Sequence, residues 1–252
     1  MLVLHICYYE RVLEYMSVIK VFIVAVLAIV VACTWYGVTV SRRLEDAKNL
    51  ISQAWAFELI SGDYAVSMLV LGDSTAVGVG ASKPEDSVPG RVAQKINATY
   101  VENHAQVGAQ VKDLESQIAA AKLREYTLIL IQIGANDIIR FRSADTAAQK
   151  LQLALEKLPK ANKVILISAG NVGGVQAFPF FVRPIHTHLT LKYHAAFDAV
   201  MKEYGGTYVN LYEDPKSDKV LLEPETYVAA DGLHLSSEGY RLWFEKIETS
   251  LE

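Results

Sequence analysis

Two short stretches of the chain are apolar at every position, and they constrain the fold more than any other feature. Residues 128–131 read LILI and residues 164–167 read VILI. A strand with one face in water alternates apolar and polar residues, whereas a central parallel strand is covered on both faces by helices. The two stretches therefore predict the central strands of a parallel sheet inside an α/β domain.

Strand-like and helix-like stretches alternate on either side of these two. The expected strands are residues 65–71, 99–103, 127–133, 163–168 and 207–211. The expected helices are residues 89–96, 110–124, 144–158, 185–204 and 236–248. Five such units predict a three-layer α/β domain with a five-stranded parallel sheet and right-handed crossovers.

Composition excludes several other classes of protein. Of the 252 residues, 52% are hydrophobic and 21% are charged, so the chain has enough apolar material for a folded core. The net charge is −4 and no basic block occurs, so we expect no nucleic-acid partner. The only cysteines are Cys7 and Cys33, which excludes a disulfide framework or a thiolate metal site in the rest of the chain.

The segment from residue 18 to residue 40 is largely apolar, and Lys20 is its only charged residue. It is long enough to cross a bilayer as a helix, and Trp35 and Tyr36 lie where an interfacial aromatic belt is expected. Residues 1–40 are therefore predicted to form a transmembrane helix that serves as an uncleaved signal anchor. The large domain after a single N-terminal span is usually exported, so we expect a membrane-anchored protein whose large domain is extracytoplasmic. The count of basic residues, slightly higher after the span than before it, leans the other way.

A second interpretation of this segment is a bacterial lipoprotein signal. Met16 then starts the signal and Cys33, after Val30-Val31-Ala32, becomes the lipidated residue. The uncleaved anchor is favoured because apolar character continues past Cys33 to Val40. Both interpretations tether the chain to a membrane.

Residues 41–60 are expected to form a juxtamembrane helix, capped by Ser41, within a stalk of residues 41–62. The turn-forming residues Ser61, Gly62 and Asp63 end that helix. They place the start of the large α/β domain, residues 63–252, at this point.

Polar and glycine-containing clusters follow the predicted strands, where open α/β sheets bind their ligands. They are Gly72-Asp73-Ser74, residues 103–109, Gly134-Ala135-Asn136-Asp137 and, in the last loop, Asp231-Gly232-Leu233-His234. Any one of them alone is a common turn or helix cap. Their occurrence together, in this order, points to one site.

The residue types in these clusters suit acyl transfer. A serine hydroxyl, Ser74, is a weak nucleophile that needs a base, and His234 is suited to that task because histidine titrates near neutrality. Asp231 is the carboxylate that orients the imidazole. An oxyanion hole needs preorganised donors, which the backbone N–H groups of Ser74 and Gly108 and the side-chain amide of Asn136 supply.

At these residues the sequence resembles the SGNH hydrolases, also called GDSL esterases and lipases. Gly72-Asp73-Ser74, Gly108, the Asn136 cluster and the His234 cluster match four of the family's blocks, and the resemblance covers about residues 66–250. It implies a flavodoxin-like SGNH fold and a carboxylic ester hydrolase that forms an acyl-enzyme on Ser74, with His234 as base and Asp231 as its orienting carboxylate. It implies no metal or organic cofactor, and a small-molecule, lipid or glycan ester as substrate.

Two other functions remain open on the same residues. One is an acyltransferase or deacetylase that acts on glycans or lipids of the cell envelope. The other is a binding module that keeps the fold without catalysis. An α/β-hydrolase elbow, Gly-x-Ser-x-Gly, is disfavoured because Ala76 occupies the last position.

Overall fold

The structure is a computed structural model that describes residues 2–60, 62 and 64–251, with side chains for Met16 and from Ile19 onward. The chain divides into two compact units, residues 1–45 and residues 46–252. Ser61 and Asp63, on which the expected start of the catalytic domain depends, lie outside the described residues, so that boundary stays a prediction.

The first helix, α1 (Leu2–Gln53), carries the apolar segment. Among the described residues, its part from Ile19 onward is long and apolar enough to cross a membrane, by length and composition, as a signal sequence also is. Ser41 does not cap a separate helix as expected, because no residue stops α1 there and it continues to Gln53. After Gln53 the helix ends, and Leu59 exchanges two backbone hydrogen bonds with Val101.

The larger unit contains a five-stranded sheet in the order β2-β1-β3-β4-β5, in which every neighbouring pair is parallel. Its strands are β1 (Ser67–Gly72), β2 (Tyr100–Asn103), β3 (Glu125–Gln132), β4 (Lys160–Ile167) and β5 (Thr207–Val209). The register pairs Ile129 with Leu69 on one side and with Val164 on the other, so the two all-apolar stretches lie side by side. The predicted fold class and sheet are confirmed.

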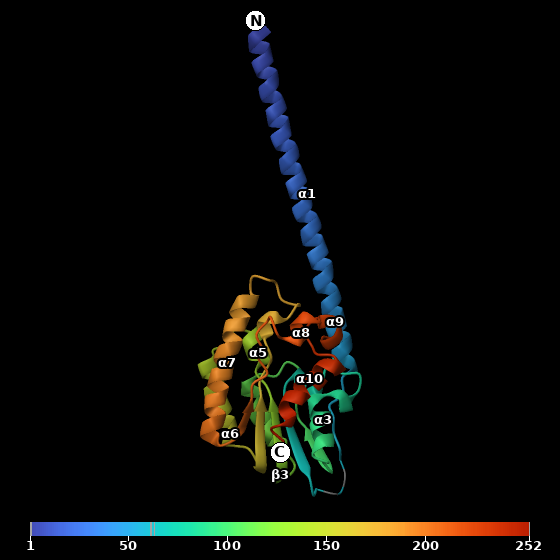
Figure 1. Cartoon of the computed structure of the whole chain (residues 1–252), viewed down its shortest axis with the longest axis vertical. Coiled ribbons are helices and arrows are strands. Elements are labelled where there is room, and N and C mark those ends of the chain that lie inside the picture. The colour runs from blue at the N-terminus through green and yellow to red at the C-terminus, as the bar shows by residue number, and fades with distance from the viewer. Residues whose placement is uncertain (1, 61, 63, 252) are drawn as a thin grey trace. The chain divides into compact units, whose positions relative to one another are not determined.

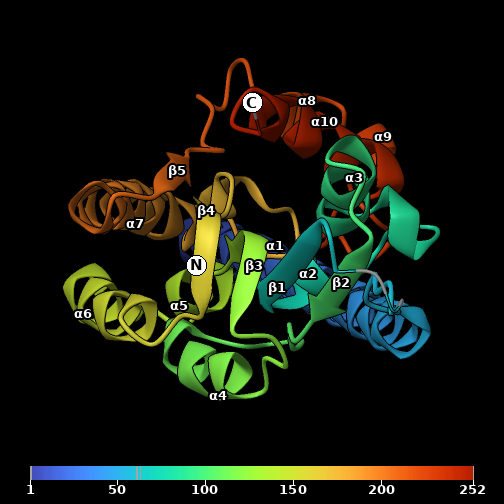
Figure 2. The same ribbon diagram turned by 90° about the horizontal axis from the view of Figure 1, so that it is seen from below.

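Helices cover both faces of this sheet (Figure 2). One face carries α4 (Leu114–Ala119), α6 (Ala144–Leu155) and α7 (Arg183–Tyr204), whose core residues pack with Leu69, Leu71, Ile129 and Ile131. The other face carries α3 (Val88–Lys95) and α10 (Ser237–Glu248), which pack with Met68, Val70, Leu128 and Leu130. Alternate residues of one strand therefore enter opposite cores, which explains why β3 is apolar throughout.

Short helices occupy the connections at the carboxyl edge of the sheet (Figure 1). They are α2 (Ser74–Val77), α5 (Ala135–Ile139), α8 (Lys219–Leu222), α9 (Pro224–Tyr227) and the 3-10 turn η3 (Val172–Gly174). Two further 3-10 turns, η1 (Pro84–Asp86) and η2 (Val111–Asp113), precede α3 and α4. Because all strands are parallel, these segments surround one edge of the sheet, where the candidate residues lie.

Candidate active site

Ser74 stands at the carboxyl end of β1, as the first residue of α2. Asp73 caps this helix: its Oδ1 accepts hydrogen bonds from the Thr75 backbone N–H (2.9 Å) and hydroxyl (2.7 Å). The side chain of Gln117 bonds both the N–H (2.7 Å) and the carbonyl (2.9 Å) of Gly72. The backbone around Ser74 is therefore held from two sides.

Ser74, His234 and Asp231 form one hydrogen-bonded chain. The Nε2 atom of His234 lies 3.0 Å from Ser74 Oγ, and its Nδ1 atom lies 2.5 Å from Asp231 Oδ2. The second oxygen of Asp231 accepts the N–H groups of Leu233 (2.9 Å) and His234 (3.0 Å). A hydroxyl, an imidazole and a carboxylate from sequence positions 160 residues apart thus meet in one relay.

The protein environment shifts the pKa values of two buried carboxyl groups near Ser74, those of Asp231 and Asp73, in opposite directions. Burial acts to raise the pKa of Asp231, but the hydrogen bond and charge of His234, with two backbone N–H groups, outweigh burial and lower that pKa. Burial raises the pKa of Asp73 to about 6, in spite of its hydrogen bonds from Thr75. Asp231 is therefore the better stabiliser of a cationic imidazole.

The predicted oxyanion donors border the same pocket as Ser74. Among the described residues, the backbone N–H groups of Ser74 and Gly108 donate to no protein group. Asn136, in α5, donates one amide hydrogen to the carbonyl of Ala109 at 3.1 Å, which orients its side chain and leaves the other hydrogen for a ligand. Ser74, Gly108 and Asn136 thus line one pocket, each with an N–H group that is free to donate to a ligand.

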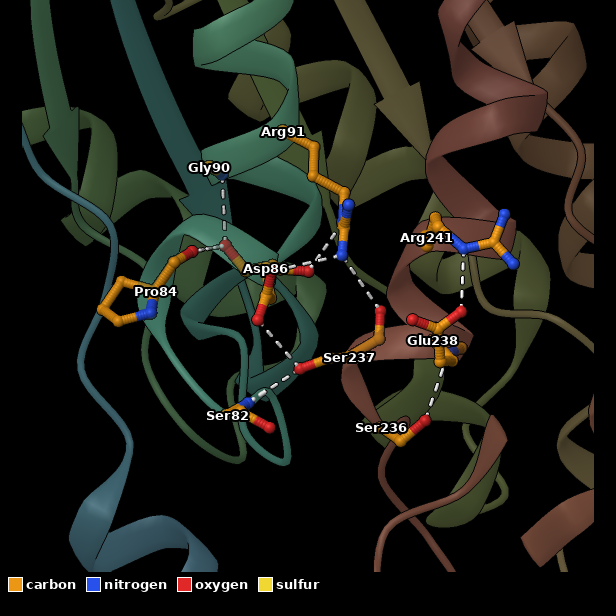
Figure 3. Close-up of polar contacts among 11 residues, drawn as sticks. Ser82, Pro84, Asp86, Gly90, Arg91, Ser236, Ser237, Glu238 and Arg241 are labelled. Carbon is orange, nitrogen blue, oxygen red and sulfur yellow. Dashed lines mark hydrogen bonds and ion pairs between the residues drawn. The ribbon is translucent and has the colours of Figure 1, made fainter. Parts of the chain in front are cut away.

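A polar cluster that the sequence analysis missed joins the segment after Ser74 to the segment after His234 (Figure 3). We call Ser82, Asp86, Arg91 and Ser237 the Ser237 cluster. The Ser82 N–H donates to Ser237 Oγ (2.9 Å), Ser237 Oγ donates to Asp86 Oδ2 (3.2 Å), and Arg91 donates to the Ser237 carbonyl (3.3 Å). The start of α10, three residues after His234, is therefore anchored to the segment that precedes α3.

Gly80 shows how closely these two segments approach. A Cβ added to Gly80 would lie 2.3 Å from the Leu235 carbonyl oxygen and 3.3 Å from His234 Cβ. Nearby, the buried Tyr240 hydroxyl donates to the carbonyl of Val79 at 2.8 Å. The loop that carries His234 is thus packed directly on the chain that leaves the Ser74 helix.

The pocket at this edge has a volume of about 250 Å³ and a mostly apolar lining. Ser74, Gly108, Asn136 and His234 line it together with apolar side chains from five segments, which are Ile51, Val107, Ile139, Val172, Val175, Leu211, Val220, Leu221, Val228, Leu235 and Trp243. Within the described part of the chain, no group of three or more His, Cys, Asp or Glu residues is placed to hold a metal ion.

The model of the GDSL-like lipase/acylhydrolase family matches residues 70–242, which is more than half of the chain and includes Ser74, Gly108, Asn136, Asp231 and His234. The chain belongs to the GDSL-like lipase/acylhydrolase family. The predicted membership of the SGNH/GDSL superfamily is thereby confirmed. Lipases and acylhydrolases, after which this family is named, are enzymes that cleave esters.

Known GDSL-like proteins resemble the chain in sequence and fold. A GDSL-like esterase from Mycobacterium tuberculosis is 28% identical over 199 residues, which are 75% of this chain and 62% of that protein. The structure of a lipolytic GDSL-family protein from Veillonella parvula has a TM-score of 0.55 at 17% identity, covering 73% of this chain and 96% of that one. A catalytic mutant of an acetylxylan esterase from Geobacillus stearothermophilus has a TM-score of 0.56 at 16% identity, covering 76% and 96%.

Proposed function

We propose that the protein is a membrane-anchored serine hydrolase that cleaves carboxylic esters through an acyl-enzyme on Ser74. The proposal rests on two consecutive hydrogen bonds. Ser74 Oγ lies 3.0 Å from His234 Nε2, and His234 Nδ1 lies 2.5 Å from Asp231 Oδ2. Such distances allow a proton to leave the hydroxyl while the carboxylate holds the imidazole in the required tautomer.

The reaction has two halves. Ser74 Oγ attacks the ester carbonyl, its proton passes to His234 Nε2, and the tetrahedral intermediate forms. Collapse of the intermediate breaks the bond to the alcohol, which leaves with the proton from His234, and the acyl group stays on Ser74. A water molecule then gives a proton to His234 and attacks the acyl group, and the acid is released as Ser74 recovers its proton.

The charge on the intermediate's oxygen would be stabilised by the oxyanion hole formed by the Ser74 and Gly108 N–H groups and the Asn136 amide. This assignment is supported by the absence of other acceptors for the two backbone groups among the described residues, and by the anchoring of Asn136 on Ala109. Preorganised donors lower the barrier most, because they need no reorganisation when charge develops.

Residues 1–40 are proposed to be the transmembrane anchor, residues 41–62 the juxtamembrane stalk, and residues 63–252 the hydrolase domain on the extracytoplasmic side. The apolar character of α1 from Ile19 onward supports the anchor. A small-molecule, lipid or glycan ester is the substrate in this proposal.

The test uses the detergent-solubilised full chain with p-nitrophenyl acetate and p-nitrophenyl butyrate. Ser74→Ala should lower kcat by several orders of magnitude, since the members of such a relay act as a unit. A matched control is Ser116→Ala, which removes an exposed serine hydroxyl on α4 and should leave kcat unchanged. Turnover that survives Ser74→Ala would contradict the proposal.

A covalent probe separates this proposal from the alternatives. A fluorophosphonate should label the wild-type chain on Ser74, and intact mass should show one adduct that Ser74→Ala abolishes. Absence of labelling would favour a non-catalytic binding module. An added alcohol acceptor that captures the acyl group faster than water would assign the same site to an acyltransferase.

A further inference from the structure

Large apolar side chains are exposed on segments at the edge of the sheet where the pocket lies. We call six of them the apolar rim, and they are 41–80% exposed: Val107, Phe141, Phe180, Phe181, Ile185 and Leu222. Each lies on a segment that follows the carboxyl end of a strand, after β2, β3, β4 or β5. Since the strands are parallel, these segments lie at the same edge of the sheet as Ser74, as the positions of α5, α8 and the start of α7 show (Figure 1).

The apolar rim continues into the pocket. Val107 is 41% exposed and also lines the pocket, and Leu222 directly follows the lining residue Leu221. Single exposed apolar residues are ordinary on a soluble surface, whereas a group around a binding site marks an interaction surface. The apolar path from the rim to Ser74 suits a substrate that arrives from an apolar phase.

The loop that carries Phe180 and Phe181 is anchored at its base by hydrogen bonds and ring contacts. Arg183 donates to the carbonyls of Phe178 (3.0 Å) and Gln176 (3.4 Å), which ties the loop of Phe180 and Phe181 to the start of α7. The buried ring of His186 lies between Phe178 and Phe141, with centroid separations of 4.8 and 4.7 Å. These contacts anchor the base of the loop, while Phe180 and Phe181 remain 80% and 65% exposed.

Chain connectivity limits how far the pocket residue Ile51 can lie from the proposed membrane anchor. Ile51, which lines the pocket, is separated from Val40, the end of the apolar segment, by only ten residues. Even a fully extended chain of that length spans about 40 Å at most. If α1 enters a bilayer as far as Val40, Ile51 stays within this distance of the bilayer surface. Exposed phenylalanine and leucine side chains gain free energy by entering such a surface.

We infer that the apolar rim docks on the bilayer entered by the chain's own apolar helix, and that the site takes lipid esters presented by that bilayer. This inference rests on the proposed function and narrows its substrate class. The rim contacts the acyl boundary of the lipid, and the lipid ester moves along the apolar path to Ser74 without crossing water.

The first experiment compares two esters in one preparation. The full chain is reconstituted in phosphatidylcholine vesicles that contain a fluorogenic diacylglycerol, and p-nitrophenyl acetate is supplied in solution. The double variant Phe180→Ser, Phe181→Ser should lower turnover of the diacylglycerol at least tenfold and change turnover of the soluble ester less than twofold. The matched control is Leu153→Ser with Leu191→Ser, which alters two exposed leucines of α6 and α7 and should change neither rate.

The outcomes separate the two proposals. Equal losses on both esters, or an unchanged rate on the diacylglycerol, would overturn docking while the hydrolase proposal stands. A wild-type chain that cleaves the soluble ester but not the diacylglycerol would overturn the lipid substrate class. A wild-type chain that cleaves neither ester and resists fluorophosphonate would instead defeat the proposed function.

A second experiment measures docking without activity. In a Cys7→Ser, Cys33→Ser background, an environment-sensitive fluorophore is attached at Phe181→Cys or, as control, at Leu153→Cys. Phosphatidylcholine with a spin label on its acyl chain should quench the fluorophore at position 181 and leave the one at position 153 bright. Equal quenching at the two positions, or none at position 181, would overturn docking.

Discussion

At the scale of single residues, the carboxyl groups of Asp73 and Asp231 have pKa values that move in opposite directions. The pKa of Asp73 is raised by burial, from 3.8 to about 6, because Thr75 supplies its hydrogen bonds and no cation adjoins it as closely as His234 adjoins Asp231. The folded state therefore binds the Asp73 proton more tightly than the unfolded state does. Its contribution to stability is complete below about pH 4 and is lost as the pH rises through about 6.

Asp73→Asn should remove this pH dependence. A rise of about two units corresponds to about 3 kcal/mol, so the stability of the wild type relative to Asp73→Asn should fall by about that amount between pH 4 and pH 8. Asparagine keeps an oxygen that accepts from Thr75, so the helix cap survives. Urea unfolding of the full chain at both pH values measures the difference. A constant difference between the two proteins would show that the carboxyl is not held neutral by burial.

Position 108 requires glycine for its left-handed backbone conformation and not for lack of space. Its φ is +79°, and the nearest atom to an added Cβ, on Arg140, is 3.8 Å away. Gly205 has φ +83° with nothing within 4 Å, so Gly205→Ala carries the same strain far from the site. Both alanine variants should lose about 1 kcal/mol of unfolding free energy. Only Gly108→Ala should also lower kcat, by about tenfold or more, since it displaces a proposed oxyanion donor. Equal kcat values for both variants would remove Gly108 from the oxyanion hole.

At the scale of elements, the Ser237 cluster joins the start of α10 to the chain before α3. Ser237→Ala removes the acceptor of the Ser82 N–H and the donor to Asp86. We expect a loss of about 1 kcal/mol in unfolding free energy, with a tenfold fall in kcat at nearly constant KM, because His234 is held less well. Ser237→Thr, which keeps the hydroxyl, should restore kcat.

Arg241→Ala is the control for that experiment. The side chain of Arg241 forms exposed ion pairs with Glu238 and Glu245 of the same helix. Surface pairs of this kind contribute little, so stability and kcat should stay near the wild-type values. A fall in kcat as large as that of Ser237→Ala would assign the effect to α10 as a whole.

The long elements were predictable and the short ones were not, for a physical reason. The all-apolar residues 128–131 and 164–167 indicate central strands, because burial on both faces leaves no place for polar residues. The short helix α8 has no such periodicity, and it begins where the Asp218 side chain accepts the Val220 N–H. A hydrogen bond of this kind is one of several that an aspartate can make, so its residue type alone does not select it.

The candidate site shows the same division. Ser74, Asp231 and His234 stand out in the sequence because their chemistry is specific. Gln117 does not, since a glutamine within a helical stretch is usually solvent-exposed. Its two bonds to the backbone of Gly72 depend on the packing of α4 against β1, which sequence periodicity does not specify.

At the scale of the whole molecule, the unbroken helix from Leu2 to Gln53 bears on how the chain meets the membrane. A lipoprotein signal requires cleavage before Cys33 and a lipid on its sulfur, whereas an uncleaved anchor leaves Cys33 as a free thiol within the span. Largely apolar sequence without charge continues from Cys33 to Val40, which exceeds the usual apolar region of a signal. This length favours the anchor.

Intact mass of the full chain, expressed in a bacterium and extracted from its membranes, tests that interpretation. An anchor keeps the mass of 27.8 kDa, and Cys33→Ser should change neither the amount in the membrane fraction nor the length of the chain. Processing would instead remove the first 32 residues and add acyl groups, and Cys33→Ser would abolish both changes. The control is Val26→Arg, which should weaken insertion because an arginine at the centre of a span costs about 3 kcal/mol. If the chain stays in the membrane fraction only while Cys33 is present, the lipid and not the helix is the tether, and the helix from Ile19 onward acts as a signal that is removed.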